Sequence, residues 1–210
     1  GIPVEEGVLR KIRPTHPDLL VVATHQGVPL RYAQDGHHGD HRNDSGGRSP
    51  DPHIWLSPRL VKIQARHIRD ALARLDPGRR SFYTANLQAF EAELDRLDAR
   101  IASALAPVRG RKMYVFHPAF GYFADAYGLT QVPIEIEGKE PGPRKLAQLI
   151  RSARRDGVKV LFVQPQFSSK SAAALAKAVG GVVVAMDPLA RDYVSNMERL
   201  AAAVEEGLRR

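Results

Sequence analysis

Three residues carry side chains that could bind a metal ion. His53 lies in the segment DPHIWLSP, just before an expected helix. His117 lies in VFHPAFGYF at the carboxyl end of an expected strand, and Asp187 follows the last expected strand in AMDPL. Two imidazole nitrogens and one carboxylate suit a borderline divalent cation such as Zn²⁺. The residue types and their positions therefore favour a metal site.

Each of the three also has a second interpretation. A histidine before a helix commonly makes only structural hydrogen bonds, and His117, between aromatic segments, could belong to the core. An aspartate before proline, such as Asp187, is usually a cap or a turn former. Their joint placement at loop and strand ends favours the metal site, but the residues alone leave both interpretations open.

The elements expected to hold His117 and Asp187 are alternating strands and helices. Apolar runs of strand length occupy residues 113–116, 132–136, 158–163 and 182–186. Helical stretches are expected near residues 118–127, 143–156, 169–179 and 194–208. This alternation predicts an α/β lobe with a parallel four-stranded sheet, covering helices and right-handed crossovers. Ligands bind such sheets beyond the carboxyl ends of the strands, which is where both residues are expected.

The first half of the chain is expected to contain a long helix and a smaller lobe. Asp76 and Pro77 predict a helix start, and apolar residues from Phe82 to Leu105 keep helical spacing to about Pro107, which predicts a helix about 45 Å long at roughly 1.5 Å per residue. Ser57 and Pro58 predict the start of the preceding helix, with the serine hydroxyl as its cap. The apolar run 19–23 has the length of a strand.

The predicted organisation has three parts. Residues 1–76 form the remnant of an N-terminal α/β lobe, residues 77–108 a long linking helix, and residues 109–210 the C-terminal α/β lobe. Within the first part, residues 33–50 read AQDGHHGDHRNDSGGRSP, which is polar and rich in glycine, aspartate and histidine. This composition has nothing to bury and predicts a mobile loop.

Composition excludes several classes of function. The chain has 31 Lys and Arg against 23 Asp and Glu, a net charge of +8, which raises nucleic acid as a partner. However, the basic residues are scattered over the expected helices without an aromatic platform for bases, so we expect no nucleic-acid partner. The chain has no cysteine, which excludes disulfides, thiolate ligands and cysteine nucleophiles.

Several segments resemble a known family. DPHIWLSP and VFHPAFGYFADAYGL resemble segments of the cluster 9, zinc/manganese-type, solute-binding proteins of ABC transporters. The segments IEIEGKEPGPRKLAQLI, FVQPQFSSKSAAALAKAVGG and VVVAMDPLARDY are similar to that family's C-terminal lobe, in the same order. The resemblance implies that His53 and His117 match two ligand histidines and that Asp187 matches the carboxylate ligand. It also places His37, His38 and His41 where zinc-type members carry a histidine-rich insertion, an auxiliary metal loop.

The resemblance also implies a function. An extracytoplasmic solute-binding protein, periplasmic or membrane-anchored, would capture Zn²⁺ between two lobes and deliver it to an ABC permease, with Mn²⁺ as the alternative cargo. Such a protein is not an enzyme. Members carry a whole first lobe with an early ligand histidine before the segment that resembles residues 1–7. The chain is therefore expected to be a fragment with an incomplete site, in which the apolar run 19–23 could pair with a second copy.

Two other functions are kept as alternatives. The first is a zinc-dependent hydrolase, in which the same ligands would hold a catalytic water beside a general base. Glu135, Glu137 and Glu140 are the candidate bases by proximity to a strand end, but the chain has no HExxH motif. The second is a metal-binding adhesin or metallochaperone of the same fold.

Overall fold

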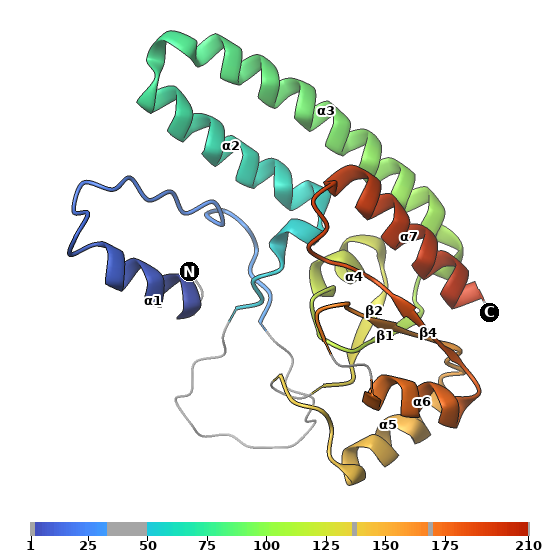
Figure 1. Cartoon of the computed structure of the whole chain (residues 1–210). Coiled ribbons are helices and arrows are strands. Elements are labelled where there is room, and N and C mark those ends of the chain that lie inside the picture. The colour runs from blue at the N-terminus through green and yellow to red at the C-terminus, as the bar shows by residue number, and fades with distance from the viewer. Residues whose placement is uncertain (1–2, 33–49, 136–137, 168–169, 210) are drawn as a thin grey trace. The chain divides into compact units, whose positions relative to one another are not determined.

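A computed structural model describes residues 3–32, 50–135, 138–167 and 170–209 of the chain (Figure 1). The chain divides into two compact units: unit 1 holds the described residues up to Arg96, and unit 2 holds those from Leu97 onward. Helix α3, Arg80–Leu105, contributes residues to both. The predicted loop with His37, His38 and His41 lies outside the described residues. The three-part division drawn from the sequence stays a prediction.

Unit 1 is built mainly from helices. They are α1 (Pro3–Ile12), the 3-10 turns η1 (Ile54–Leu56) and η2 (Pro77–Arg79), α2 (Pro58–Leu75) and the first part of α3. Helices α2 and α3 run side by side in opposite directions (Figure 1). Ion pairs join them, with 2.6 Å from Lys62 Nζ to Asp95 Oδ1 and 2.6 Å from Arg66 Nε to Glu91 Oε1.

The predicted start of α2 is confirmed in position but not in its cap. Ser57 is the N-cap residue and Pro58 the first helical residue, as expected, yet the serine side chain makes no capping hydrogen bond. The backbone carbonyl of Ser57 instead accepts from the N–H groups of Leu60 and Val61. The helix start therefore depends on the fixed φ of proline and on backbone bonds.

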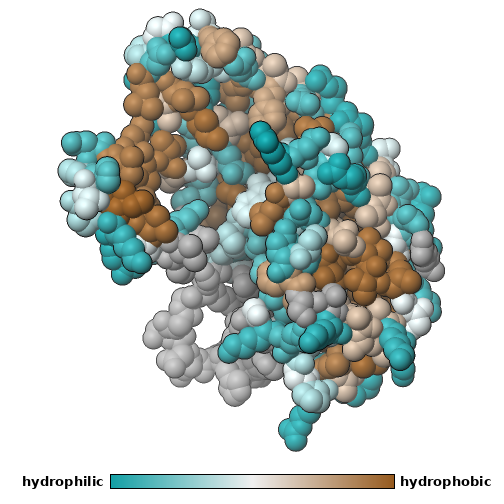
Figure 2. All heavy atoms as spheres, in the orientation of Figure 1, coloured by the Kyte–Doolittle hydropathy of each residue, from teal (hydrophilic) through white to brown (hydrophobic). Residues whose placement is uncertain are grey.

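The predicted strand at residues 19–23 is wrong, and α1 was not predicted. Residues 19–23 belong to no strand, and the β-pairing described in unit 1 is a single bridge between Tyr32 and Pro50. A strand needs a neighbour to pair with, and propensity alone cannot supply one. Leu19, Leu20 and Val21 are consequently 40–49% exposed. Figure 2 shows hydrophobic residues gathered over the segment after α1 and over part of α2.

Unit 2 contains the predicted parallel four-stranded sheet. Its strands are β1 (Lys112–Val115), β2 (Thr130–Pro133), β3 (Val160–Val163) and β4 (Val182–Ala185). They lie in the order β2-β1-β3-β4 and every pair is parallel. These parallel pairs confirm the fold-class prediction. Parallel strands need crossover connections, and the helices between the strands supply them.

Helices cover both faces of this sheet (Figure 1). They are α4 (Gly121–Tyr127), α5 (Pro143–Arg155), α6 (Lys170–Val179) and α7 (Tyr193–Arg209). On one face, Leu149 of α5 and Leu175 of α6 share a buried cluster with Leu161 of β3. On the other, Gly207 of α7 approaches Val160 and Phe162 so closely that an added Cβ would lie 3.0 Å from each side chain.

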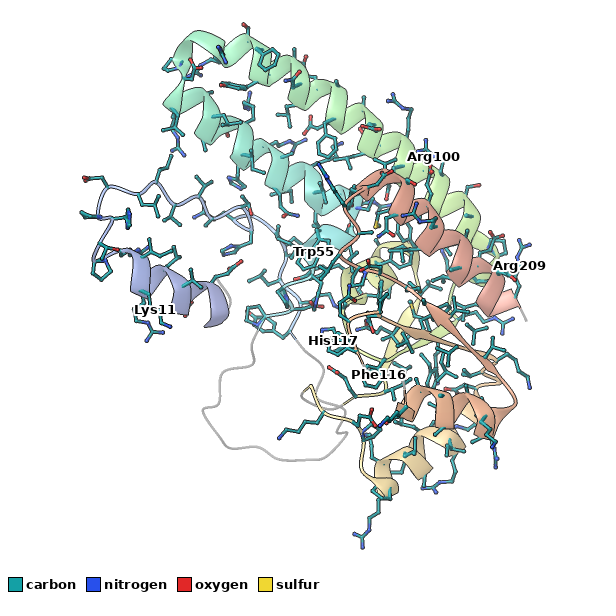
Figure 3. All side chains as sticks on the ribbon, in the orientation of Figure 1. Lys11, Trp55, Arg100, Phe116, His117 and Arg209 are labelled. Carbon is teal, nitrogen blue, oxygen red and sulfur yellow. The ribbon has the colours of Figure 1, made fainter. Side chains whose placement is uncertain are left out.

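Polar contacts tie the helices of unit 2 to one another and to the sheet. Arg100 of α3, labelled in Figure 3, places Nε 2.6 Å from Glu198 Oε1 of α7. Asp156, the C-cap residue of α5, accepts a 2.8 Å hydrogen bond from the Tyr114 hydroxyl and a 2.9 Å hydrogen bond from Lys112 Nζ. Burial raises the pKa of Tyr114, which keeps its hydroxyl protonated as a donor.

None of the described helices is both long and apolar enough to cross a membrane.

Candidate metal centre

His117 lies just beyond the carboxyl end of β1, next to Phe116 (Figure 3). Its Nδ1 is 2.6 Å from Oε1 of Glu135, a residue that is only 6% exposed. Glu135 follows β2, and because β1 and β2 are parallel neighbours, their carboxyl ends meet at one edge. This topology brings together two residues that are 18 positions apart. From the sequence, Glu135 is a candidate only for a hydrolytic base, and spacing along the chain does not predict its contact with His117.

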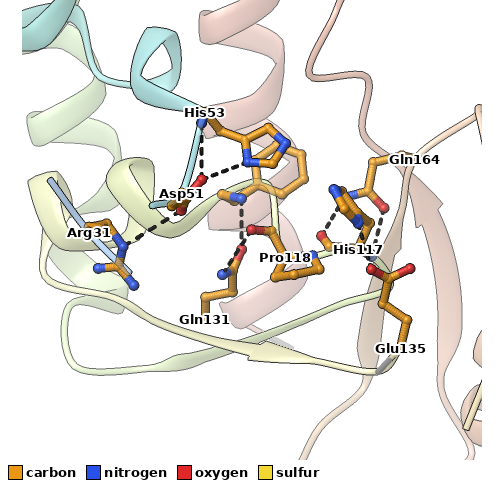
Figure 4. Close-up of polar contacts among 9 residues, drawn as sticks. Arg31, Asp51, His53, His117, Pro118, Gln131, Glu135 and Gln164 are labelled. Carbon is orange, nitrogen blue, oxygen red and sulfur yellow. Dashed lines mark hydrogen bonds and ion pairs between the residues drawn. The ribbon is translucent and has the colours of Figure 1, made fainter. Parts of the chain in front are cut away.

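Two further side chains hold His117 in place. Gln164, fully buried after β3, accepts from the His117 backbone N–H at 3.1 Å and donates through Nε2 to the His117 carbonyl at 2.6 Å (Figure 4). The ring of Phe167 stacks on the imidazole, with centroids 4.7 Å apart and 19° between the planes. The backbone and the ring of His117 are thus both fixed, by two residues whose roles the sequence does not predict.

His53 has a carboxylate partner of its own, from its own segment. Asp51 Oδ1 lies 2.7 Å from His53 Nδ1 and accepts a 3.0 Å hydrogen bond from the His53 backbone N–H (Figure 4). Arg31 Nε lies 3.8 Å from the other carboxylate oxygen. The DPH sequence already contained this signal, because an aspartate two residues before a histidine can reach both its N–H and its ring.

Asp187 makes the contacts of a turn former, as its second interpretation predicted. Its Oδ1 accepts from the Leu189 backbone N–H at 2.9 Å and from Gln166 Nε2 at 2.8 Å. Asn196 Nδ2 donates to its backbone carbonyl at 2.8 Å. These bonds fix the loop after β4, and the predicted ligand role of Asp187 stays a prediction.

The structure does not gather the three predicted ligands in one unit. His53 belongs to unit 1, whereas His117 and Asp187 belong to unit 2. Within the described residues of either unit, no three histidine, aspartate or glutamate side chains are grouped closely enough to hold a metal. What each unit does contain is a histidine–carboxylate pair. Metal-binding histidines in proteins typically donate their other ring N–H to such a carboxylate.

Unit 2 is an open, three-layer α/β domain with functional side chains beyond the carboxyl ends of its parallel strands, which defines a ligand-binding class of α/β proteins. Because its histidine–carboxylate pair has the arrangement typical of metal-binding histidines, unit 2 is a candidate metal-binding domain within this class. The family described as "ZnuA: Zinc-uptake complex component A periplasmic" matches residues 1–207, and the chain belongs to this family. The resemblance to cluster 9 solute-binding proteins is confirmed.

Individual relatives agree with this assignment. The chain is 32% identical to the zinc-binding protein AdcA of Streptococcus pyogenes serotype M3, over 72% of this chain and 30% of that protein. It is 33% identical to the high-affinity zinc uptake system protein ZnuA of Yersinia pestis, over 77% of this chain and 53% of that protein. It therefore spans between about a third and a half of these relatives. A crystal structure of ZnuA matches with a TM-score of 0.90 and 40% identity, over 99% of this chain and 77% of that one.

Proposed function

We propose that this chain is part of an extracytoplasmic solute-binding protein that captures Zn²⁺ and delivers it to the permease of an ABC importer. The observation that carries the proposal is a contact that His53 and His117 have in common. Each histidine of the two family motifs has its Nδ1 against a buried carboxylate, as zinc-binding histidines do. The names of the family and of the two relatives, all of which refer to zinc, support the same cargo.

We further propose His53, His117 and Asp187 as ligands to the transported ion. Two imidazoles favour Zn²⁺ over Mn²⁺, whereas the carboxylate suits either ion. We propose residues 1–76, 77–108 and 109–210 as N-terminal lobe, linking helix and C-terminal lobe. The role of His37, His38 and His41 as an auxiliary metal loop stays a prediction.

A binding function rather than hydrolysis is supported by the partners of the candidate bases. A hydrolase would need a carboxylate aimed at a metal-bound water. Glu135 Oε1 instead contacts His117, and Glu140 Oε2 accepts a 2.5 Å hydrogen bond from the Ser171 hydroxyl. Glu137 lies outside the described residues. Both described glutamates are thus engaged with other side chains, and the metal is the cargo.

Competition titration against a chromophoric zinc chelator tests this function. We expect the chain to bind Zn²⁺, and His53→Ala or His117→Ala to weaken binding at least about tenfold, because each removes a bond to the metal. His16→Ala is the matched control, since His16 is exposed and, among the described residues, its ring hydrogen-bonds only to the neighbouring Thr15. The absence of zinc binding in the wild-type chain, or an unchanged affinity in either variant, would contradict the proposal.

A further inference from the structure

The two candidate ligand histidines share one local geometry although they belong to different units. In unit 1, Asp51 Oδ1 lies 2.7 Å from Nδ1 of His53. In unit 2, Glu135 Oε1 lies 2.6 Å from Nδ1 of His117. Both carboxylates are buried, with exposed fractions of 9% and 6%. The carboxylate comes in one case from the same tripeptide and in the other from the segment that follows the neighbouring strand β2.

This geometry selects which ring nitrogen can bind a metal. A carboxylate accepts hydrogen bonds but donates none, so the proton of a neutral imidazole must be on the Nδ1 that faces it. The lone pair then lies on Nε2, on the far side of the ring. A hydrogen bond from Nδ1–H to a carboxylate also makes the imidazole a more basic ligand and fixes the plane of the ring.

Packing alone does not account for Glu135. Its Oε2 is buried and, among the described residues, has no hydrogen-bond partner. Leaving a buried polar atom unsatisfied costs roughly 1–3 kcal/mol, and more for a charged group. A residue whose only task was to fill this space would be apolar at no such cost. The carboxylate is therefore explained by what its first oxygen does for His117.

We propose that Asp51 and Glu135 are positioning residues, which hold His53 and His117 as Nδ1–H tautomers so that Nε2 carries the lone pair that binds Zn²⁺. This inference rests on the proposed function and deepens it. Asp51 also has a local structural role, because it accepts a hydrogen bond from the His53 backbone N–H. Among the described residues, the Glu135 side chain makes no hydrogen bond besides the one to the ring, so Glu135 gives the sharper test.

The test compares near-isosteric variants of the 210-residue chain. Glu135→Gln and Asp51→Asn keep size and hydrogen-bonding capacity but lose the charge and the requirement for a donor on Nδ1. We expect zinc affinity to fall roughly 10- to 100-fold, with partial recovery in Glu135→Asp. Glu140→Gln and Asp76→Asn are the matched controls. They change carboxylates that accept hydrogen bonds from Ser171 and Tyr83, and the zinc affinity of these two variants should be unchanged.

Two readouts separate positioning from a structural role. The melting temperature without metal should move no more in the test variants than in the controls, because the packing is kept. The ¹⁵N spectrum of the imidazoles should show the Nδ1–H tautomer for His53 and His117 in the wild-type chain at pH 8, and a mixture of tautomers in the variants. If a variant fails to fold, the tautomers seen in the wild-type spectrum still test the inference.

Each outcome has a separate meaning. Zinc affinity that falls in His117→Ala but is unchanged in Glu135→Gln would overturn the inference and leave the proposed function standing. An Nε2–H tautomer for His117 in the wild-type chain would also overturn it. Affinity unchanged in both His117→Ala and Glu135→Gln would instead contradict the proposed function.

Discussion

At the residue scale, the candidate ligands differ in how many tasks their side chains perform. The imidazoles of His53 and His117 are oriented by other residues, whereas Asp187 itself orients a turn. An aspartate has two oxygens, so a turn contact through Oδ1 is compatible with a metal bond through the carboxylate. The two tasks depend on different properties: the turn needs an acceptor, and the metal needs a negative charge.

Asp187→Asn therefore distinguishes the two tasks. The asparagine Oδ1 still accepts from Leu189 and Gln166, so the free energy of unfolding without metal should change by less than about 0.5 kcal/mol. Zinc affinity should fall at least about tenfold, because a neutral amide is a poor ligand for Zn²⁺. Isothermal titration and urea unfolding measure both quantities. Asp192→Asn, in another capping aspartate, is the control, and an Asp187→Asn chain with wild-type zinc affinity would make Asp187 a turn former alone.

The sequence predicted the histidines better than their partners. His53 and His117 could be found because each lies in a recognisable segment, and Asp51 was visible in the same segment as His53. Glu135 and Gln164 are 18 and 47 residues from His117. Their proximity follows from the strand order β2-β1-β3, which spacing along the chain does not specify. Partners from neighbouring strands become predictable only once the topology is known.

At the element scale, predictions succeeded where an element could be completed by other predicted elements. The four strands of unit 2 and the helices between them were expected close to their observed bounds, because each apolar run has parallel neighbours and a helix to cover it. The apolar run 19–23 has the same composition but no described strand beside it, and it forms none. Strand formation is a property of the sheet as much as of the segment.

The link between β1 and α5 predicts a pH dependence of stability. Burial acts to raise the pKa of Asp156, but hydrogen bonds from Lys112 and Tyr114 outweigh it and hold the pKa below the usual 3.8. Between the folded and unfolded pKa values the unfolded chain binds more protons, so stability falls as pH decreases. We expect the free energy of unfolding to decline as pH is lowered from about 5 to below 4, and Asp156→Asn to remove part of that decline.

Urea unfolding at a series of pH values measures this effect. Asp156→Asn should already be less stable than wild type at pH 7, because the charged acceptor of two hydrogen bonds has been lost. Asp70→Asn is the control, since its carboxylate is 59% exposed and pairs only with the adjacent Arg69 among its described ion pairs. Identical pH profiles for wild type and Asp156→Asn would show that this network does not contribute to the acid sensitivity of unit 2.

At the scale of the whole molecule, the two units differ in how their backbones are satisfied. In unit 2, the central strands β1 and β3 have ladder partners on both sides. In unit 1, the stretch 19–23 belongs to no helix or strand, and within the described chain Leu19 is its one residue whose N–H donates to a backbone carbonyl. Resistance to local opening follows buried contacts and satisfied backbone bonds, so the two regions should open with different free energies.

Hydrogen exchange followed by mass spectrometry should resolve this difference. Amides in residues 113–115 and 160–163 should be protected up to the global unfolding free energy, because they lie in a paired and buried sheet. Amides in residues 20–23 should exchange almost as fast as in an unstructured peptide. Light scattering on the same samples determines whether a second copy is involved, since an unpaired extended segment offers N–H and C=O groups to another chain. Protection of residues 20–23 that rises with protein concentration would show pairing between copies through this segment. Strong protection in a strictly monomeric sample would instead mean that unit 1 satisfies this backbone by itself, and the contrast between the two units drawn from their hydrogen bonds would be wrong.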